Sequence, residues 1–131
     1  MKGFEADGGV TYRNRFRVVF CTKYGREVLS EQAIARAEQV LKSVAAQDGV
    51  EIKELEIHPS YVQMFIEFNP KLALHNVVVH LQRKSAGVLR EEFPELKSRL
   101  PSLWSRNYLA CSTGKLMDGD AERYVMSQKG M

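Results

Sequence analysis

Residues 12–21, YRNRFRVVFC, decide how the chain folds, because two kinds of side chain alternate along them. Aromatic and aliphatic side chains dominate the even positions, with Phe16, Val18 and Phe20 in the centre of the run. Arginines precede Val19 and Cys21 at the odd positions; they are Arg13, Arg15 and Arg17. A period of two is typical of a β-strand, whose successive side chains point to opposite faces. The stretch therefore predicts a strand with one face in a core and arginines along half of the other.

Working outward, the pattern predicts a helix and then two strands. Ser30 is a good helix N-cap, apolar residues repeat at helical spacing from Ile34 to Val44, and Asp48-Gly49 supplies the stop. Two alternating runs, 50–57 and 62–68, flank the connection at 58–61. This arrangement predicts an antiparallel strand pair.

The second half of the chain predicts a helix, a strand and a last helix. Apolar residues at helical spacing run from about 74 to 93, Pro94 and Pro101 bracket a loop that holds Trp104, and 108–113 form a short strand. Asp118 or Asp120 can cap the final helix. The order β-α-β-β-α-β-α matches, in its first six elements, the split βαβ plan. We therefore expect an α+β, ferredoxin-like (RRM-like) antiparallel sheet, with a C-terminal helix that carries Tyr124.

Length and composition bound the class of protein. With 131 residues, 44% of them hydrophobic and 27% charged, the chain suits one domain with its own core. Residues 1–11 lack periodicity and predict a flexible lead-in, which leaves 12–131 as the domain. No apolar run approaches the ~20 residues that span a bilayer, and the first residues do not resemble a signal peptide. We expect a cytoplasmic protein in which Cys21 and Cys111 are reduced thiols, with a contact between them on neighbouring strands left open.

Basic and aromatic residues suggest two interpretations. The net charge is only +3, so on these residues alone a solvated basic face is favoured, with a nucleic-acid partner as the alternative. Phosphates attract cations, and aromatic rings such as Tyr12, Tyr24 and Trp104 can stack on unpaired bases, which suits single-stranded or hairpin nucleic acid. The candidate nucleic-acid-binding residues are Arg13, Arg15, Arg17, Lys23, Arg26, Lys71, Arg83, Lys84 and Trp104.

Several segments together resemble a known family, and the common catalytic motifs (Walker loop, GxSxG, HExxH) are absent from the sequence. The segments are 20–29, FCTKYGREVL; 70–71, PK, with KS at 84–85; 102–105, SLWS, with Tyr108; and 124–128, YVMSQ. In order and spacing they resemble the single-tyrosine, HUH-type transposases called TnpA, of the insertion-sequence-two-hundred group. The resemblance covers nearly the whole chain from residue 12.

The resemblance implies a mechanism and its residues. Such enzymes cut and rejoin single-stranded DNA near hairpins through a 5′-phosphotyrosine link, and use a divalent metal, magnesium or manganese. They act as homodimers in which the terminal helix of one subunit completes the metal site of the other. Carried over, the nucleophile is Tyr124 and one metal ligand is Gln128.

The resemblance breaks at the metal histidines. The family's Pro-Asp-His-hydrophobic-His string aligns with residues 59–63, PSYVQ, which places Tyr61 and Gln63 where histidines are expected. Alternation still predicts that both lie on one strand face, with His58 out of phase with it. A phenol must lose a proton before it binds a metal well, and an amide oxygen is a weak donor. We expect metal affinity to be largely lost.

Three functional hypotheses follow from the sequence. The leading one is a dimeric TnpA-like protein that binds hairpin DNA with cleavage and strand transfer lost or impaired. The second is an active transposase that uses Tyr124 and an altered metal site of Gln63, Gln128 and water, with Tyr61 as a further ligand. The third is an RNA-binding ferredoxin-like protein, because such sheets are also a common RNA-binding platform.

Overall fold

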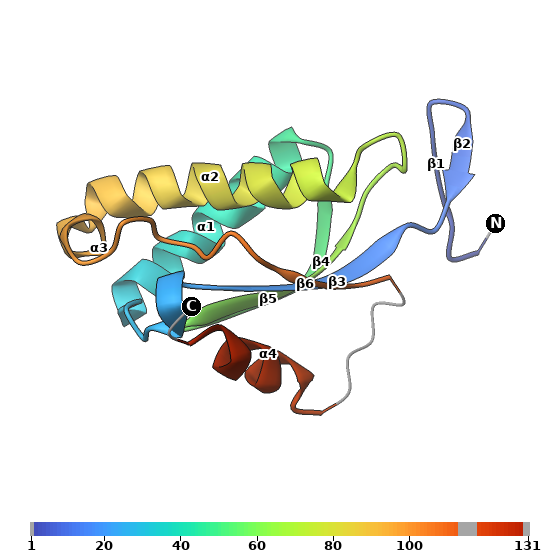
Figure 1. Cartoon of the computed structure of the whole chain (residues 1–131). Helices are drawn as coiled ribbons and strands as arrows, with labels where there is room; N and C mark the ends of the chain where they lie inside the picture. Colours follow the sequence, from blue (N-terminus) through green and yellow to red (C-terminus); the bar gives the residue numbers. More distant parts are fainter. Residues whose placement is uncertain (1, 113–117, 130–131) are drawn as a thin grey trace.

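The computed structural model describes residues 2–112 and 118–129, and its centre is a four-stranded antiparallel sheet. The strands lie in the order β4 (Glu51–His58), β5 (Tyr61–Glu67), β3 (Arg15–Cys21) and β6 (Leu109–Cys111) (Figure 1). β3 pairs along its whole length with β5, from Arg15 opposite Glu67 to Cys21 opposite Tyr61. The alternating strands expected from the sequence are confirmed, with a register shift in β4 between Ile52 and Glu54.

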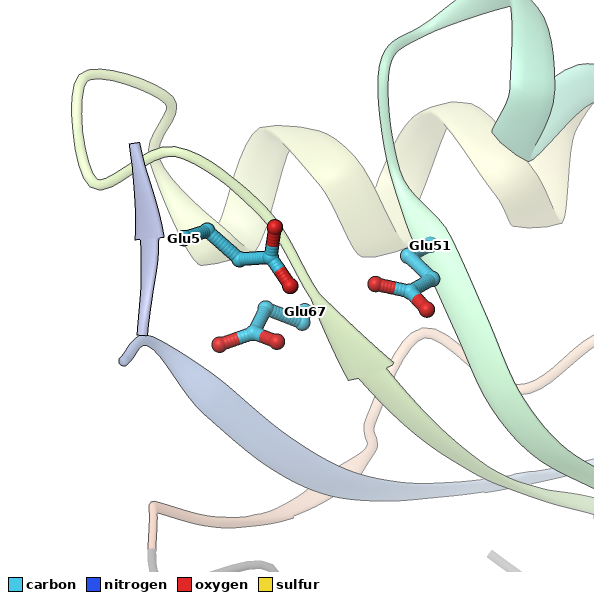
Figure 2. Close-up of side chains that lie close together, drawn as sticks. All are labelled: Glu5, Glu51 and Glu67. Atoms are coloured by element: carbon cyan, nitrogen blue, oxygen red, sulfur yellow. The ribbon is translucent and has the colours of Figure 1, made fainter. Parts of the chain in front are cut away.

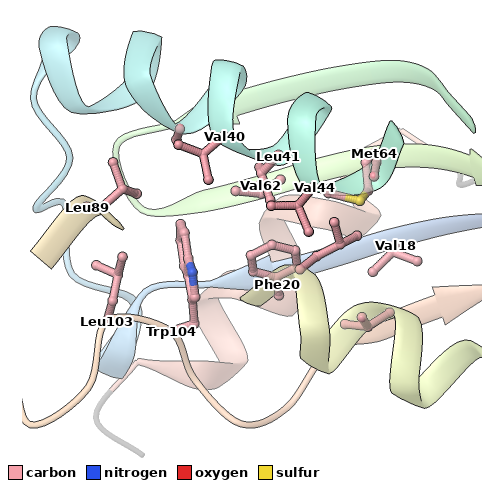
Figure 3. Packing of buried hydrophobic residues seen from close by; sticks show 14 of the residues in the cluster. Val18, Phe20, Val40, Leu41, Val44, Val62, Met64, Leu89, Leu103 and Trp104 are labelled. Atoms are coloured by element: carbon pink, nitrogen blue, oxygen red, sulfur yellow. The ribbon is translucent and has the colours of Figure 1, made fainter. Parts of the chain in front are cut away.

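Two long helices cover one face of the sheet. α1 (Glu31–Gln47) and α2 (Leu74–Glu92) lie side by side there (Figure 1). The Ser30 side chain accepts a hydrogen bond from the Ala33 amide, which confirms the predicted N-cap of α1. Beneath them lies the main core, in which Phe20 meets Trp104 edge to face at 4.9 Å (Figure 3). The even-numbered face of β3 is therefore the core face, as its alternation predicts.

The opposite face of the sheet carries the last helix, α4 (Asp120–Gln128) (Figure 1). A smaller apolar cluster joins Val19 and Cys21 of β3 to Ala121 and Val125 of α4. The N-cap of α4 is Gly119, with φ 84°, and not the side chain of Asp118 or Asp120 that the sequence suggested. Glycine adopts this left-handed conformation without the strain of a Cβ. The helix therefore begins after a glycine turn, with no side-chain cap.

Two segments have more regular structure than the sequence indicated. Residues predicted as a flexible lead-in form a hairpin of β1 (Glu5–Asp7) and β2 (Val10–Tyr12), which projects from the body of the domain (Figure 1). Its strands are too short to give a recognisable period. The predicted loop between Pro94 and Pro101 begins with the short helix α3 (Pro94–Ser98), with proline in its first turn, where proline is tolerated.

The two cysteines, Cys21 and Cys111, lie apart on the sheet. Cys111 pairs with Arg17 of β3, four residues along that strand from Cys21. No helix within 2–112 or 118–129 is both long and apolar enough to cross a membrane.

Candidate functional site

The residues at the expected metal-ligand positions lie on the sheet face that α4 covers. Tyr61 and Gln63 of β5 line one small polar cavity of about 240 Å³, which confirms that they share a face. We call this cavity the Tyr61 pocket; its lining residues are Glu56, His58, Tyr61, Gln63, Asp118, Gly119, Ala121 and Glu122.

His58 belongs to this pocket, and the expectation that it is out of phase was wrong. β4 continues through His58, which pairs directly with Tyr61, and directly paired residues share a face of the sheet. The two rings stack with centroids 4.3 Å apart, and His58 Nε2 lies 3.2 Å from a carboxylate oxygen of Glu56. The connection is therefore shorter than the sequence suggested, because pairing extends to both ends of the turn.

Tyr61 is held as a neutral phenol. Its hydroxyl donates a long hydrogen bond, 3.5 Å, to Glu122 of α4. Burial raises the pKa of Tyr61, and the negative charges of Glu122 and Glu56 raise this pKa further. At neutral pH the side chain is a proton donor to a carboxylate, which is the opposite of the anionic form that a metal ion would need.

Tyr124 has a buried hydroxyl. It lies in α4 beside the Val19–Cys21 cluster, and its hydroxyl oxygen has no hydrogen-bond partner among the described residues. Burial raises the pKa of Tyr124 to about 12, with a smaller contribution from the neighbouring Cys21. The residue implied as nucleophile therefore points its oxygen into packed protein in this conformation.

Gln128, the remaining implied ligand, is engaged elsewhere. Its side-chain oxygen accepts a hydrogen bond from the Asn107 amide at 3.1 Å, and its nitrogen donates to the Ser127 hydroxyl. Tyr61 instead stacks on His58 and donates a hydrogen bond to Glu122. Within one chain, the contacts of Gln128 and those of Tyr61 therefore involve different neighbours.

Among the described residues of the Tyr61 pocket, no three His, Asp or Glu side chains bring their ligand atoms within 4.8 Å of one another. Among the described residues, one group of three or more His, Cys, Asp or Glu side chains has ligand atoms that meet within 4.8 Å, and it lies elsewhere: Glu5, Glu51 and Glu67 (Figure 2). Arg15 Nε lies 3.2 Å and Lys53 Nζ 3.4 Å from one oxygen of the buried Glu67. Two cations thus offset much of this charge, and the group is accounted for as an ion-pair network.

The strand arginines predicted to bind DNA are already paired within the chain. Arg15 contacts Glu67, and Arg17 forms an ion pair of 2.8 Å with Glu54 while lying over the Phe65 ring. Arg13 donates to the Gly3 carbonyl and lies over the Phe4 ring in the N-terminal hairpin region. Glu67 and Glu54, the partners of Arg15 and Arg17, come from distant parts of the sequence, so the alternation alone could not reveal them.

Trp104 is not available for base stacking. It is 5% exposed, and its indole N–H donates to the buried Ser85 hydroxyl at 3.0 Å. A large aromatic ring with one polar atom suits such a position in a core. Its contact with Phe20 makes it part of the fold, which corrects its place among the candidate DNA-binding residues.

The other candidate cations divide into two places. Lys71 donates to the Gly8 carbonyl beside the N-terminal hairpin, and Lys84 is exposed on α2. Lys23 and Arg83 line a larger hollow of about 720 Å³ between α2 and residues 101–106, and Arg26 lies just outside it over the Tyr24 ring. The candidate set missed two further arginines of this hollow, Arg90 and Arg106. Arg90 could have been included from the sequence, since helical spacing puts it on the polar side of α2 together with Arg83.

Solved structures give the class of protein to which this fold corresponds. A crystal structure of a protein assigned as a transposase, from Deinococcus radiodurans R1, superposes with a TM-score of 0.85 at 23% identity, covering 97% of this chain and 99% of that one. A REP-associated tyrosine transposase bound to a REP hairpin superposes with a TM-score of 0.57 at 9% identity, covering 86% and 62%. The fold is that of a small transposase.

Sequence comparison gives the family. The family model described as "Transposase IS200 like" matches residues 10–128, and the chain belongs to this family. It is 26% identical over 122 residues to the ISDra2 transposase TnpA of Deinococcus radiodurans, covering 92% of this chain and 87% of the relative. It is also 26% identical over 103 residues to the transposase of insertion sequence element IS200 from Salmonella typhimurium, covering 77% and 68%.

Proposed function

We propose that this chain is a TnpA-like protein that binds single-stranded or hairpin DNA at insertion-sequence ends, with DNA cleavage and strand transfer lost or impaired. We place it in the cytoplasm and classify its sheet as ferredoxin-like, which the strand order β4-β5-β3-β6 supports. The observation that carries the proposal is the content of the Tyr61 pocket. A neutral phenol and an amide stand where the resemblance implies two metal histidines, and the Tyr61 hydroxyl donates to Glu122.

The charge of the pocket argues against the chemistry. Divalent ions assist phosphodiester cleavage by stabilising charge that develops on phosphate oxygens. Glu56 and Glu122 line this pocket, so its own charge would repel a phosphate instead. The buried Tyr124 hydroxyl, with a pKa near 12, is also a poor nucleophile at neutral pH.

DNA binding is supported by relatives and does not depend on these groups. The family is one of transposases, and the solved relative bound to a REP hairpin shares the fold. Phosphate contacts from lysine and arginine need no metal ion. A protein of this family could therefore keep its DNA-binding surface after its metal ligands are replaced.

We further propose a homodimer in which α4 is exchanged between subunits, as the resemblance implies. α4 lies on the sheet through a small apolar cluster of Val19, Cys21, Tyr61, Ala121 and Val125. So small a contact is easily replaced by an equivalent one with a second copy. Exchange would bring the partner's α4 beside the Tyr61 pocket without restoring the missing histidines.

The test uses a labelled single-stranded oligonucleotide that carries a hairpin from the flanks of the gene. The chain is incubated with it in magnesium or manganese, and the sample is divided between a native and a denaturing gel. We expect a complex on the native gel and no covalent adduct on the denaturing gel. An adduct that disappears in Tyr124→Phe would contradict the loss of cleavage, and easy displacement of the DNA by unpaired RNA would favour an RNA-binding function instead.

A further inference from the structure

A second hollow in the molecule has the opposite charge to the Tyr61 pocket. It lies between α2 and the segment 101–106, is also lined by two residues of the 3-10 turn η1 (Lys23–Gly25), and has a volume of about 720 Å³. We call it the α2 groove. Its lining residues are Lys23, Tyr24, Val79, Gln82, Arg83, Ala86, Arg90, Pro101, Ser102, Leu103, Trp104, Ser105 and Arg106.

Every charged residue that lines the α2 groove is a cation. Its charged members are Lys23, Arg83, Arg90 and Arg106, and none of the described residues that line it is Asp or Glu. Arg83 and Arg106 are exposed, and neither forms an ion pair or hydrogen bond with another described residue. Arginines that are not neutralised within the chain can pair with an external anion. In this they differ from Arg15 and Arg17, which contact Glu67 and Glu54.

The groove is built on rigid parts of the fold. Arg90 donates to the Leu100 carbonyl at 3.1 Å, which ties α2 to the segment that forms the other wall. Gln82 donates to the Ser105 carbonyl at 3.2 Å and so joins the same two walls further along. The buried Trp104 forms the floor and belongs to the core. These two hydrogen bonds hold the walls of the groove together, so its backbone needs no rearrangement to bind an extended chain.

One lining residue of the groove, Tyr24, is aromatic and lies in a strained turn. Tyr24 has φ 64°, in the left-handed region that residues with a side chain rarely adopt. In this conformation its half-buried ring lies near two cations, 5.2 Å from Lys23 Nζ and 5.1 Å from Arg26 Cζ. Gly25 follows with φ 65°, and a Cβ there would lie 2.9 Å from Lys129 Cγ, so the turn also packs closely against the end of α4. The turn therefore holds an aromatic ring and the Lys23 charge in the lining of the groove, with Arg26 on the same ring just outside it.

We propose that the α2 groove binds the sugar–phosphate backbone of single-stranded DNA, with Arg83 and Arg106 contacting phosphates and Tyr24 at its edge. A cationic channel bordered by an aromatic ring is the combination that binds single strands with little sequence preference. This assignment rests on the proposed function, and adds to it the surface and residues that hold the DNA. It also separates the DNA from the acidic Tyr61 pocket, which lies on the other face of the sheet.

The experiment measures DNA affinity by fluorescence anisotropy, in EDTA, for the wild-type chain and for the double variant Arg83→Gln/Arg106→Gln. The probes are a hairpin oligonucleotide with single-stranded flanks and an unstructured oligothymidylate. We expect the double variant to bind both probes roughly tenfold more weakly at 0.1 M salt. The slope of log affinity against log salt should also fall by about 0.7 for each phosphate contact removed.

Two controls make the outcome specific. Arg83→Lys/Arg106→Lys keeps both charges and should retain most of the affinity, whereas Lys42→Gln removes an exposed charge of α1 that is paired with Glu38 and should leave the affinity unchanged. Thermal unfolding at the wild-type temperature would show that the double variant is folded, as expected for exposed side chains. Equal affinity and salt slope for the wild type and Arg83→Gln/Arg106→Gln would overturn the groove assignment. Failure of the wild-type chain to bind either probe would instead overturn the proposed function.

Discussion

The Tyr61 pocket and the α2 groove lie on opposite sides of one sheet and carry opposite charge. The pocket gathers Glu56 and Glu122 around a neutral phenol, while the groove gathers four cations and no carboxylate among its described lining residues. In a transposase of this family, the pocket corresponds to the chemistry and the groove, in our proposal, to DNA recognition. On this proposal the two tasks rest on separate residues, so replacing the residues of one need not disturb the other.

The largest expected effect is on stability and concerns Trp104, which lies in the core and also lines the groove. Trp104→Ala should lower the free energy of unfolding by about 3–5 kcal/mol, because it empties a fully packed site against Phe20. Urea unfolding measures this change, and Leu72→Ala, at a residue 41% exposed, serves as a control with an expected change below about 0.5 kcal/mol. A loss below about 1 kcal/mol would mean that Trp104 is free of the core and available to bases.

The next effect concerns the pocket and reverses its replaced ligands. Tyr61→His/Gln63→His should create a manganese site, since two neutral imidazoles on one strand face bind a divalent ion far better than a phenol and an amide. We expect a gain of at least about tenfold in affinity, or 1.4 kcal/mol, by calorimetry. Gln63→His alone, with one imidazole, should give a smaller gain. If the double variant shows no gain, the pocket is unsuited to metal for reasons beyond these two residues.

A smaller effect tests the buried hydroxyl of Tyr124. Tyr124→Phe should raise the free energy of unfolding by about 1 kcal/mol at neutral pH, because it removes a buried oxygen with no hydrogen-bond partner. The folded pKa of about 12 exceeds the unfolded value of 10, so the folded state holds the proton more tightly. Wild-type stability should therefore fall as pH rises from 10 through 12, and the advantage of Tyr124→Phe should widen over that window. Destabilisation by Tyr124→Phe at pH 7 would show that the hydroxyl has a partner.

The smallest effect tests the charge contrast itself. Glu56→Gln/Glu122→Gln should tighten binding of hairpin DNA by about two- to threefold at low salt, because it removes two negative charges from the chain without touching the groove. The same change should vanish at high salt, where charges on opposite sides of the sheet are screened. Anisotropy at both salt concentrations measures it, with Glu38→Gln/Glu92→Gln on the helical side as the matched pair. Weaker binding by the pocket variant would place DNA contacts in the pocket.

Local patterns foresaw most of the fold. The alternation of residues 15–21 predicts both faces of β3, and the spacing from Ser30 to Gly49 predicts α1 and its cap. The N-terminal hairpin was not predicted, because its strands have three residues each around Gly8-Gly9, too few to establish a period. The N-cap of α4 was also predicted wrongly. Its cap is Gly119 with a positive φ, and the sequence shows only that the residue is a glycine, not which φ it adopts.

The functional surfaces were harder to foresee because they depend on pairs distant in sequence. Arg17 and Glu54 are 37 residues apart, and nothing in either segment indicates that they neutralise each other. Arg106 comes to the groove through a loop, and its charge matters only because α2 places Arg83 along the same groove. His58 lies in the Tyr61 pocket because the strand register pairs it with Tyr61. A register shifted by one residue would place its side chain on the other face of the sheet.

Uptake of manganese by the wild-type chain tests the central claim most directly. Free manganese has an electron paramagnetic resonance signal that falls when the ion binds a protein. We predict that adding the chain leaves this signal unchanged at equimolar concentrations, because Tyr61 and Gln63 occupy the positions where the resemblance implies two metal histidines. Loss of one equivalent of signal per chain, reversed by Gln63→Ala, would contradict the account.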